Sequence, residues 1–205
     1  MQTKVKICGI SRDVDTEYLN TSLPDYTGFI INYPKSRRNI TPQRAKELSK
    51  QLDPRIITVG VFVDNDLYEI AELANCGVID VIQLHGNESE EYISHLRSET
   101  GAEIWKSFIV KTEADIIAAQ KSSADKVLLD GGLGCGVSFD HSLISNIGRE
   151  FILAGGLNIS NIETSLKTID PWAVDISSGV ETDGVKDGKK ISEIVSFVRN
   201  FSKII

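Results

Sequence analysis

Short apolar runs recur along the chain at intervals of roughly 25 residues, the spacing expected when a helix follows each strand. Each run has the length of a strand and a near-continuous apolar character, which is typical of strands covered on both faces. The runs occupy residues 5–10, 27–33, 56–63, 81–86, 103–110, 126–131, 151–157 and 172–179. Helical patterns separate them, most clearly at residues 41–52 and 66–76. In a final helix, one apolar face is formed by Ile191, Ile194, Val195, Val198 and Phe201.

Eight alternating strand and helix units predict an α/β fold, a (β/α)₈ barrel that spans residues 1–205 as a single domain. The chain is short for this fold, which typically needs about 250 residues, so its loops should be brief. An open doubly wound sheet is the alternative. That fold would not normally need eight units, and it would usually carry one dominant glycine fingerprint near the N-terminus, which the sequence lacks.

Composition and charge narrow the class of partner. The chain is 41% hydrophobic and 25% charged, with a formal net charge of −7. This balance argues against a nucleic-acid surface but is compatible with a local basic pocket for a small anion. No window approaches the roughly 18 apolar residues of a membrane span, and the first residues lack the apolar region of a signal peptide. We expect a cytoplasmic protein whose cysteines, Cys8, Cys76 and Cys135, are free thiols.

The active site of such a barrel lies at the carboxyl ends of its strands, where this sequence is too polar for a core. On the first strand, apolar residues at alternate positions would face the helices, which turns Lys6 and Cys8 into the barrel. The same alternation turns Asp130 and Asp175 inward on the sixth and eighth strands. A thiol and two carboxylates should therefore meet at one mouth.

Each of these groups also has a purely structural interpretation. Cys8 would suit packing as a small buried hydrophobe, but Lys6, one inward position below it, would favour the thiolate form that can act as a base. Asp130 either caps the following loop or serves as a general acid. Burying Asp175 without a partner would be costly, so it should pair with a ligand donor or with Lys6.

Small residues follow each of the last two predicted strands: Gly155 and Gly156 in one exit, Ser178 and Gly179 in the other. Glycine lets the backbone approach a ligand closely and turn its N–H groups toward an anion. The loops after the last two strands of (β/α)₈ barrels are a frequent phosphate site. Two such exits favour phosphate binding over simple tight turns. Residues 158 and 160, asparagine and serine, are candidate caps for the next helix.

Other polar residues near the strand ends have more than one interpretation. Arg37 and Arg38 are either solvated charges or bind a carboxylate in a bidentate way. Gln83 and His85 are hydrogen-bonding or metal-binding groups. The remaining histidines, His95 and His141, fall in predicted helices, so we expect no divalent-metal site. The glycine-rich run at residues 130–140 is interpreted as a loop that closes over the mouth.

Taken as a set, these stretches resemble the phosphoribosylanthranilate isomerases of tryptophan biosynthesis. The similar motifs follow one another in the family's order along the whole chain. They are KICGI at 6–10, GFI at 28–30, YPKSRRNITP at 33–42, VGVFV at 59–63, VIQLHG at 81–86, LLD at 128–130, FD at 139–140, LAGGLN at 153–158 and VDISSGVE at 174–181. None of these motifs is specific alone, but together they are.

The resemblance implies roles for individual residues. Cys8 would be the general base and Asp130 the general acid of an Amadori rearrangement that needs no cofactor and no metal. Arg38, rather than Arg37, would bind the anthranilate carboxylate, and Asp175 would contact the substrate. The other expected substrate-binding residues are Lys6, Gln83 and His85, and the phosphate-binding backbone belongs to Gly155, Gly156, Ser178 and Gly179. The expected partner is a small phosphorylated molecule, and the protein is expected to be a monomer or homodimer.

The sequence also departs from the family pattern, and two other functions compete. Cys135 and Val137 stand in a short loop where the family is richer in small residues, and His141 and Asn39 replace aromatic or bulky residues. Another phosphosugar isomerase or epimerase would fit the same barrel, but the metal-dependent ones need more histidines at the strand ends. A non-catalytic barrel that binds a phosphorylated ligand would need neither the thiol nor the acid. Activity on the aminoaldose of histidine biosynthesis is not expected, because such enzymes use two carboxylates.

Overall fold

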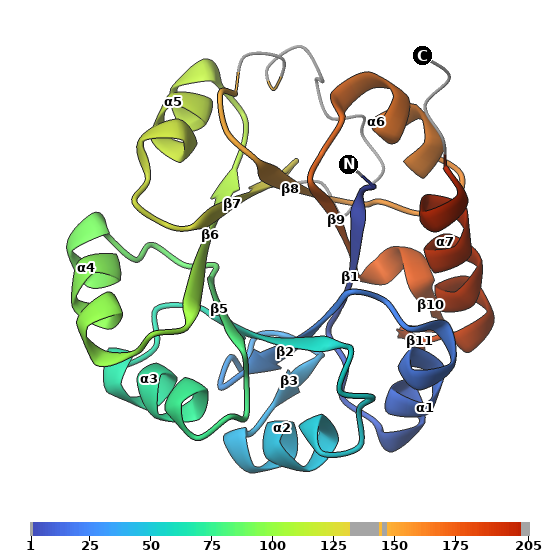
Figure 1. Cartoon of the computed structure of the whole chain (residues 1–205), viewed down its shortest axis with the longest axis horizontal. Helices are drawn as coiled ribbons and strands as arrows, with labels where there is room; N and C mark the ends of the chain where they lie inside the picture. The colour runs from blue at the N-terminus through green and yellow to red at the C-terminus, as the bar shows by residue number, and fades with distance from the viewer. Residues whose placement is uncertain (1, 132–143, 145–146, 202–205) are drawn as a thin grey trace.

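The computed structural model describes residues 2–131, 144 and 147–201, which form a closed parallel barrel surrounded by helices (Figure 1). The sheet runs in the order β1-β9-β8-β7-β6-β5-β4-β2-β3 and closes because β1 also pairs with β2. The barrel strands are β1 (Lys4–Cys8), β2 (Tyr26–Ile31), β4 (Ile57–Phe62), β5 (Val81–Leu84), β6 (Glu103–Ile109), β7 (Lys126–Asp130), β8 (Phe151–Ala154) and β9 (Ala173–Ile176). The predicted (β/α)₈ barrel is confirmed, and each predicted apolar run overlaps one of these strands.

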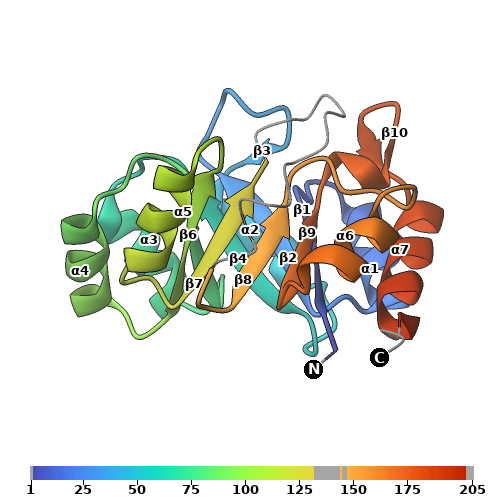
Figure 2. The same cartoon turned by 90° about the horizontal axis from the view of Figure 1, so that it is seen from above.

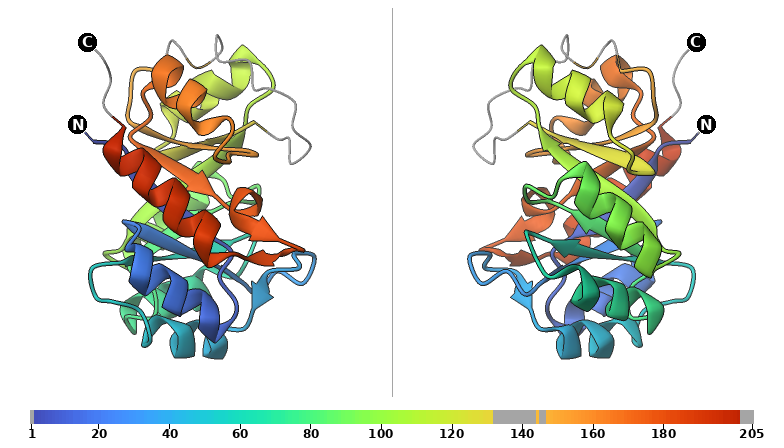
Figure 3. Two further views of the ribbon diagram at one scale, coloured as in Figure 1. Left: turned by 90° about the vertical axis from the view of Figure 1, so that its right-hand side faces the viewer. Right: turned by 90° about the vertical axis from the view of Figure 1, so that its left-hand side faces the viewer.

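Helices cover the outside of the barrel (Figure 1). Those that the structure describes are α1 (Asp13–Ser22), α2 (Pro42–Ser49), α3 (Leu67–Asn75), α4 (Glu90–Glu99), α5 (Glu113–Lys121), α6 (Ile162–Ile169) and α7 (Gly188–Asn200). The α1 and α7 helices pack side by side, which joins the two ends of the chain (Figure 3). Local chemistry sets several boundaries: the Thr41 hydroxyl accepts from the Arg44 N–H before α2, and the Asp66 carboxylate accepts from the first N–H groups of α3. Both predicted helices are therefore present, within the expected limits.

The core has two layers. Inside the barrel, one buried cluster consists of Tyr26, Val59, Val81, Trp105, Leu128, Ile152, Ala154 and Ala173. A larger cluster fills the space between strands and helices, and it includes Val5, Ile7, Val127, Leu129, Val174 and Ile176, as the alternation predicts. The α7 residues Ile191, Ile194, Val195 and Val198 are buried in this outer layer, whereas Phe201 follows the last helical residue and is partly buried. The packed interior forms a floor beneath the polar strand ends.

Two short additions stand at the carboxyl ends of the strands. The first, β3 (Asn39–Ile40), pairs with the end of β2, and its Asn39 carboxamide oxygen accepts from the Tyr33 N–H. The second is an antiparallel hairpin of β10 (Glu181–Thr182) and β11 (Val185–Lys186). Figure 2 shows both on the same side of the barrel. Neither was predicted, because two-residue strands carry no periodic signal.

Several predictions concern residues that the structure does not describe. The glycine-rich loop is described only at Asp130 and Gly131, and Cys135, Val137 and His141 lie outside the described residues. His95 lies in α4, as predicted. Within the described residues, no helix is long and apolar enough to cross a membrane.

Candidate active site

A cavity of about 440 Å³ opens at the carboxyl ends of the strands. The predicted site residues that line it are Cys8, Gln83, His85, Asp130, Gly155, Gly156, Asp175 and Ser178. Tyr33 and Ser36, from the loop after β2, also line it. Strand ends from all around the barrel thus converge on one volume, which makes this cavity the candidate active site.

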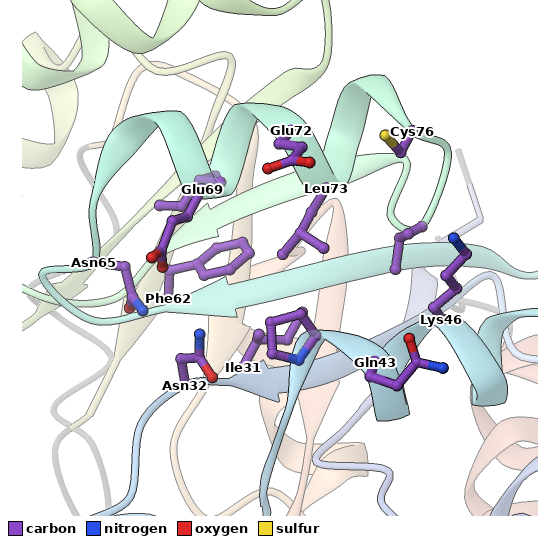
Figure 4. A pocket seen from close by; sticks show the side chains of 13 residues that line it. Ile31, Asn32, Gln43, Lys46, Phe62, Asn65, Glu69, Glu72, Leu73 and Cys76 are labelled. Atoms are coloured by element: carbon purple, nitrogen blue, oxygen red, sulfur yellow. The ribbon is translucent and has the colours of Figure 1, made fainter.

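A second cavity, of about 350 Å³, lies between α2 and α3 outside the barrel (Figure 4). Ile31, Phe62 and Leu73 point into it, and Lys46 and Glu72 come from the two flanking helices. None of the predicted site residues lines this groove. The candidate chemistry is therefore confined to the barrel mouth.

A buried ion pair lies beneath the mouth. The Lys6 ammonium donates to Asp175 Oδ2 at 2.8 Å, and the Lys6 side chain is fully buried. The sheet register creates this pair, because Lys6 on β1 lies directly opposite Asp175 on β9. Burial is the largest single influence and lowers the pKa of Lys6, but the interactions with Asp175 and Cys8 together raise it by more, so the net shift is upward and Lys6 is an ammonium group. Lys6 is one of the two partners that the sequence predicted for Asp175.

The Cys8 thiol lies between opposing influences. Burial raises its pKa and outweighs the lowering effects of the Lys6 and Lys186 ammonium groups. Lys6 therefore favours the thiolate, as predicted, but the net shift is upward because burial has the larger effect. The sequence shows the neighbouring charge but not the degree of burial.

Gln83 and His85 extend from β5 toward Asp130 on β7. The Gln83 Nε2 lies 3.2 Å from His85 Nδ1 and also donates to Ser107 Oγ at 3.2 Å. Burial lowers the pKa of His85, and the opposing effect of Asp130 is smaller, so the imidazole is neutral at neutral pH. Because Nδ1 accepts from the amide, the ring proton is assigned to Nε2, which lies 3.9 Å from Asp130 Oδ2. His85 thus turns an N–H toward the candidate acid.

The two glycine exits pack tightly against their neighbours. Gly155 has φ +101, and a side chain there would meet the Gly131 nitrogen at 2.8 Å and Asp130 Oδ1 at 3.0 Å. A side chain on Gly179 would lie 1.9 Å from the Leu157 carbonyl oxygen. Glycine is therefore required at both positions, by left-handed backbone geometry at Gly155 and by close approach of the chains at each. The exits after β8 and β9 form one contiguous backbone surface.

The expected caps of the helix after β8 are wrong by a few residues. The α6 helix begins at Ile162, with Asn161 in the N-cap position. Asn158 instead closes the preceding turn: its carboxamide oxygen accepts from the Ser160 N–H at 2.9 Å, and its own N–H donates to Asn161 Oδ1 at 2.9 Å. The turn lengthens the loop, because it inserts residues between the glycine pair and the helix.

Arg38 is held at the rim by Glu181 of β10. Its Nε donates to Glu181 Oε1 at 2.6 Å and its Nη2 to Oε2 at 2.9 Å, a bidentate pair. Arg37 pairs with the same carboxylate, and the Lys186 ammonium donates to Oε1 at 2.9 Å. Burial raises the pKa of Glu181, but hydrogen bonds from Arg38 and Lys186 lower it to a net value of about 2. The Glu181 carboxylate thus pairs with three cationic side chains.

Glu181 and Lys186 are the residues that the site prediction missed. Both residues could have been suspected from the sequence, because Glu181 ends the VDISSGVE motif and Lys186 follows it closely. Nothing in the local pattern says that a hairpin returns these side chains to the arginine loop after β2. In the described part of the chain, Arg38 Nη1 donates to no acceptor, so one edge of the guanidinium remains available to a ligand.

The model of the family described as N-(5′-phosphoribosyl)anthranilate (PRA) isomerase matches residues 5–197. The chain belongs to this family. The N-(5′-phosphoribosyl)anthranilate isomerase of Clostridium acetobutylicum is 40% identical over 207 residues, which cover 97% of this chain and 98% of that one. The corresponding protein of Clostridium kluyveri is 42% identical over 200 residues, covering 96% and 98%.

Solved structures of phosphoribosylanthranilate isomerases agree with the fold over nearly the whole chain. The crystal structure of the Thermotoga maritima isomerase has a TM-score of 0.86 and 33% identity, and the match covers 97% of this chain and all of that one. An isomerase in complex with reduced 1-(o-carboxyphenylamino)-1-deoxyribulose 5-phosphate has a TM-score of 0.85 at 33% identity, with the same coverage. Another structure, at 34% identity, is of monomers of the dimeric T. maritima isomerase.

Among the residues that the structure describes, no group of three or more histidine, cysteine, aspartate or glutamate side chains is placed to hold a metal ion. The polar groups at the mouth are instead a thiol, two carboxylates, an imidazole and backbone glycines. These groups suit proton transfer and anion binding.

Proposed function

We propose that this chain is a phosphoribosylanthranilate isomerase of tryptophan biosynthesis. It converts N-(5-phosphoribosyl)anthranilate to 1-(2-carboxyphenylamino)-1-deoxyribulose 5-phosphate, an aldose–ketose isomerisation within one molecule. The observation that carries the proposal is that Cys8, Asp130, Gly155, Gly156 and Ser178 line a single cavity. The family match and the related isomerase bound to a reduced product support the same substrate class.

Substrate binding follows from the charges and the backbone at the mouth. The N–H groups of Gly155, Gly156, Ser178 and Gly179 hold the phosphate, since backbone amides at such loops favour anions. Arg38 binds the anthranilate carboxylate through the guanidinium edge that Glu181 leaves available.

Two buried acceptors from residues that line the cavity lack a hydrogen-bond donor among the described residues, Asp175 Oδ1 and Gln83 Oε1. Burying such atoms without a partner is costly. Sugar hydroxyl groups of the substrate supply the missing donors. Lys6 contributes from below by fixing the Asp175 carboxylate.

The reaction then needs one acid and one base. Asp130 gives a proton to the ribose ring oxygen, the bond from that oxygen to C1 breaks, and the nitrogen lone pair forms the Schiff base. The Cys8 thiolate removes the proton from C2, and the C–H electrons neutralise the iminium to give an enolamine. The enolamine tautomerises to the ketose by protonation at C1. Burial raises the pKa of Cys8. The thiolate is therefore a minor species, but it is a strong base when it forms.

The experiment that tests the function is conversion of the substrate by the purified protein in the presence of EDTA. We expect rapid decay of the fluorescence of N-(5-phosphoribosyl)anthranilate and formation of the ketose product, unaffected by the chelator. A wild-type protein that binds the reduced product but converts no substrate would instead be a barrel that binds a phosphorylated ligand. Loss of conversion on chelation would replace the acid–base mechanism by a metal-dependent one.

A further inference from the structure

Gly28 on β2 lies directly beside the candidate base. The sheet register pairs Gly28 with Cys8 of β1, and Gly28 belongs to an inward-facing set of positions. A β-carbon built on Gly28 would lie 2.7 Å from the Cys8 sulfur and 2.9 Å from the Lys6 ammonium nitrogen. Carbon atoms do not approach other heavy atoms so closely without a shift. The volume that a side chain would need at this position is therefore occupied by the Lys6 and Cys8 side chains.

Backbone conformation does not explain this glycine. Gly28 is absent from the glycines with positive φ, and it occupies the middle of a regular strand. Glycine inside a strand weakens it, because it loses more conformational freedom on folding and packs no side chain. Glycine at this position thus lowers the stability of the strand, but it leaves space beneath the mouth, where β1 and β2 meet.

The Lys6 ammonium is held in place, whereas the Cys8 sulfur belongs to a residue that lines the cavity. The Lys6 ammonium is fully buried and tied to Asp175 at 2.8 Å. Cys8 is buried as well, with its carbonyl oxygen accepting from Ser177 Oγ at 3.0 Å. An alanine methyl would have to displace the nitrogen, the sulfur or the strand itself, and each displacement separates a charge from the group it stabilises.

We propose that Gly28 is a positioning residue for the isomerisation: its missing side chain leaves the space that the Lys6 ammonium and the Cys8 sulfur both border. The ammonium then stabilises the negative charge that forms when Cys8 loses its proton. This inference rests on the proposed function, in which Cys8 is the base. The effect of Gly28 on the charge state of Cys8 can be measured without turnover.

The electrostatics around Cys8 support this role. The charged groups that act on its sulfur are Lys6 on the same strand, Asp175 on β9 and Lys186 on β11. Lys6 gives the largest effect that opposes burial, and Asp175 acts in the same direction as burial. Moving the ammonium away leaves burial and Asp175 less opposed. The thiolate population at a given pH should then fall.

The test compares Gly28→Ala with Gly60→Ala. Gly60 is a matched control on the adjacent strand β4, because its added methyl would meet Ile79 and Phe62 at 2.6 and 2.7 Å, away from the cavity. Thiolate formation is followed by ultraviolet absorbance during a pH titration, and the titration of the same protein carrying Cys8→Ser is subtracted. The subtraction removes Cys76 and Cys135.

We expect Gly28→Ala to raise the titration midpoint of Cys8 by about 1–3 pH units, the usual effect of losing a close opposite charge. Turnover should fall at least about tenfold, since one unit is a factor of ten in thiolate population. Affinity for the reduced product should stay within a few-fold. Gly60→Ala should leave the Cys8 midpoint unchanged, even if it lowers stability.

An unchanged midpoint in Gly28→Ala, or an equal shift in Gly60→Ala, overturns the proposal. Lys6→Met supplies a second check if Gly28→Ala does not fold: its Cys8 midpoint should rise by a similar amount, and an unchanged value also overturns the proposal. Failure of the proposed function has a different signature. In that case the wild-type protein converts no N-(5-phosphoribosyl)anthranilate, whereas the Gly28→Ala titration still reports whether the glycine controls the thiol.

Discussion

Glu181 contributes to substrate recognition indirectly, by holding Arg38 in place. Its side chain is only 4% exposed and holds Arg38 by two hydrogen bonds, at 2.6 and 2.9 Å. The guanidinium is thereby oriented before the substrate arrives, so less freedom is lost when a carboxylate binds to its other edge. Arg37 contacts the same carboxylate from outside, with its side chain 58% exposed. The two arginines therefore have different consequences when removed.

Glu181→Gln should raise KM for the substrate about tenfold, with kcat within a few-fold of wild type. The physical reason is that a charge-assisted hydrogen bond contributes about 1.5–3 kcal/mol and that Arg38 acts in substrate binding rather than in proton transfer. Steady-state kinetics measures both constants. Arg37→Ala is the matched control and should change KM by less than about twofold, because exposed ion pairs contribute little. A fall in kcat at unchanged KM would contradict this role for Glu181.

The same residue predicts a pH dependence of stability. The pKa of Glu181 in the folded protein is about 2, below its ordinary value of 4.5. A lowered carboxylate pKa stabilises the folded state above the unfolded-state pKa and loses that effect as pH falls toward the folded-state pKa. The difference in free energy of unfolding between wild type and Glu181→Gln should therefore be largest above pH 4.5 and shrink toward pH 2. Denaturant titrations across this range measure it, and a constant difference would contradict it.

Sequence reasoning at this scale succeeded where the decisive contacts are local or follow from strand alternation. Alternation placed Lys6, Cys8 and Asp175 correctly, because facing depends only on the position within a strand. It did not reveal the net shift of the Cys8 pKa, which depends on how closely other strands pack around the sulfur. The link between Arg38 and Glu181 was equally invisible, since it joins residues far apart in the chain.

At the scale of secondary-structure elements, a buried ion pair ties three strand ends together. Lys106 of β6 donates to Glu88 Oε2 at 2.9 Å and to the Gly86 carbonyl oxygen at 2.7 Å. The other Glu88 oxygen accepts from the Asp64 N–H at 2.9 Å, in the loop after β4. Both charged side chains are nearly inaccessible to solvent. This pair fixes the loops that flank the His85 position.

Lys106→Met should lower the free energy of unfolding by about 3–5 kcal/mol, because it leaves the Glu88 charge buried without its cation. The double variant Lys106→Met with Glu88→Gln should lose less, since the neutral amide keeps an oxygen for the Asp64 N–H and leaves no buried charge. Chemical denaturation measures both values. Equal or greater loss in the double variant would show that the cost comes from packing and not from the unpaired charge.

The elements themselves were largely predictable, and the reasons are local. Thr41 and Pro42 mark the start of α2, and Asp66 marks the start of α3, through interactions within one turn. The α6 start was misplaced because Asn158 and Asn161 are both competent to cap, and the choice depends on how the glycine exit turns. The β3 strand and the β10–β11 hairpin were too short to leave a pattern.

For the whole molecule, the sequence predicted the (β/α)₈ barrel because eight apolar runs at regular spacing leave few alternatives. Closure could not be read from any one run, since it depends on the pairing of β1 with both β2 and β9. That pairing also creates the chemistry of the site, because it sets Lys6 against Asp175 and Cys8 against Gly28. The register of β1, β2 and β9 thus determines both the closure of the barrel and the arrangement of the site.

A single domain remains a prediction for the whole molecule, and it has a direct test. Trp105 and Trp172 lie together at the inner cluster, with ring centroids 6.0 Å apart, so their fluorescence reports on the barrel interior. Far-ultraviolet circular dichroism reports mainly on the outer helices. The two denaturation curves should coincide in one cooperative transition. Transitions with separate midpoints would mean that the barrel unfolds in more than one unit.

The most direct test of the acid–base assignment is a paired measurement on Asp130→Asn: turnover of N-(5-phosphoribosyl)anthranilate and affinity for reduced 1-(o-carboxyphenylamino)-1-deoxyribulose 5-phosphate. An acid used in the transition state contributes mainly to turnover, so kcat should fall by about 10²–10⁴-fold while the affinity stays within a few-fold. Near-normal turnover in this variant would contradict the role of Asp130. So would a loss of affinity large enough to account for the whole loss of activity.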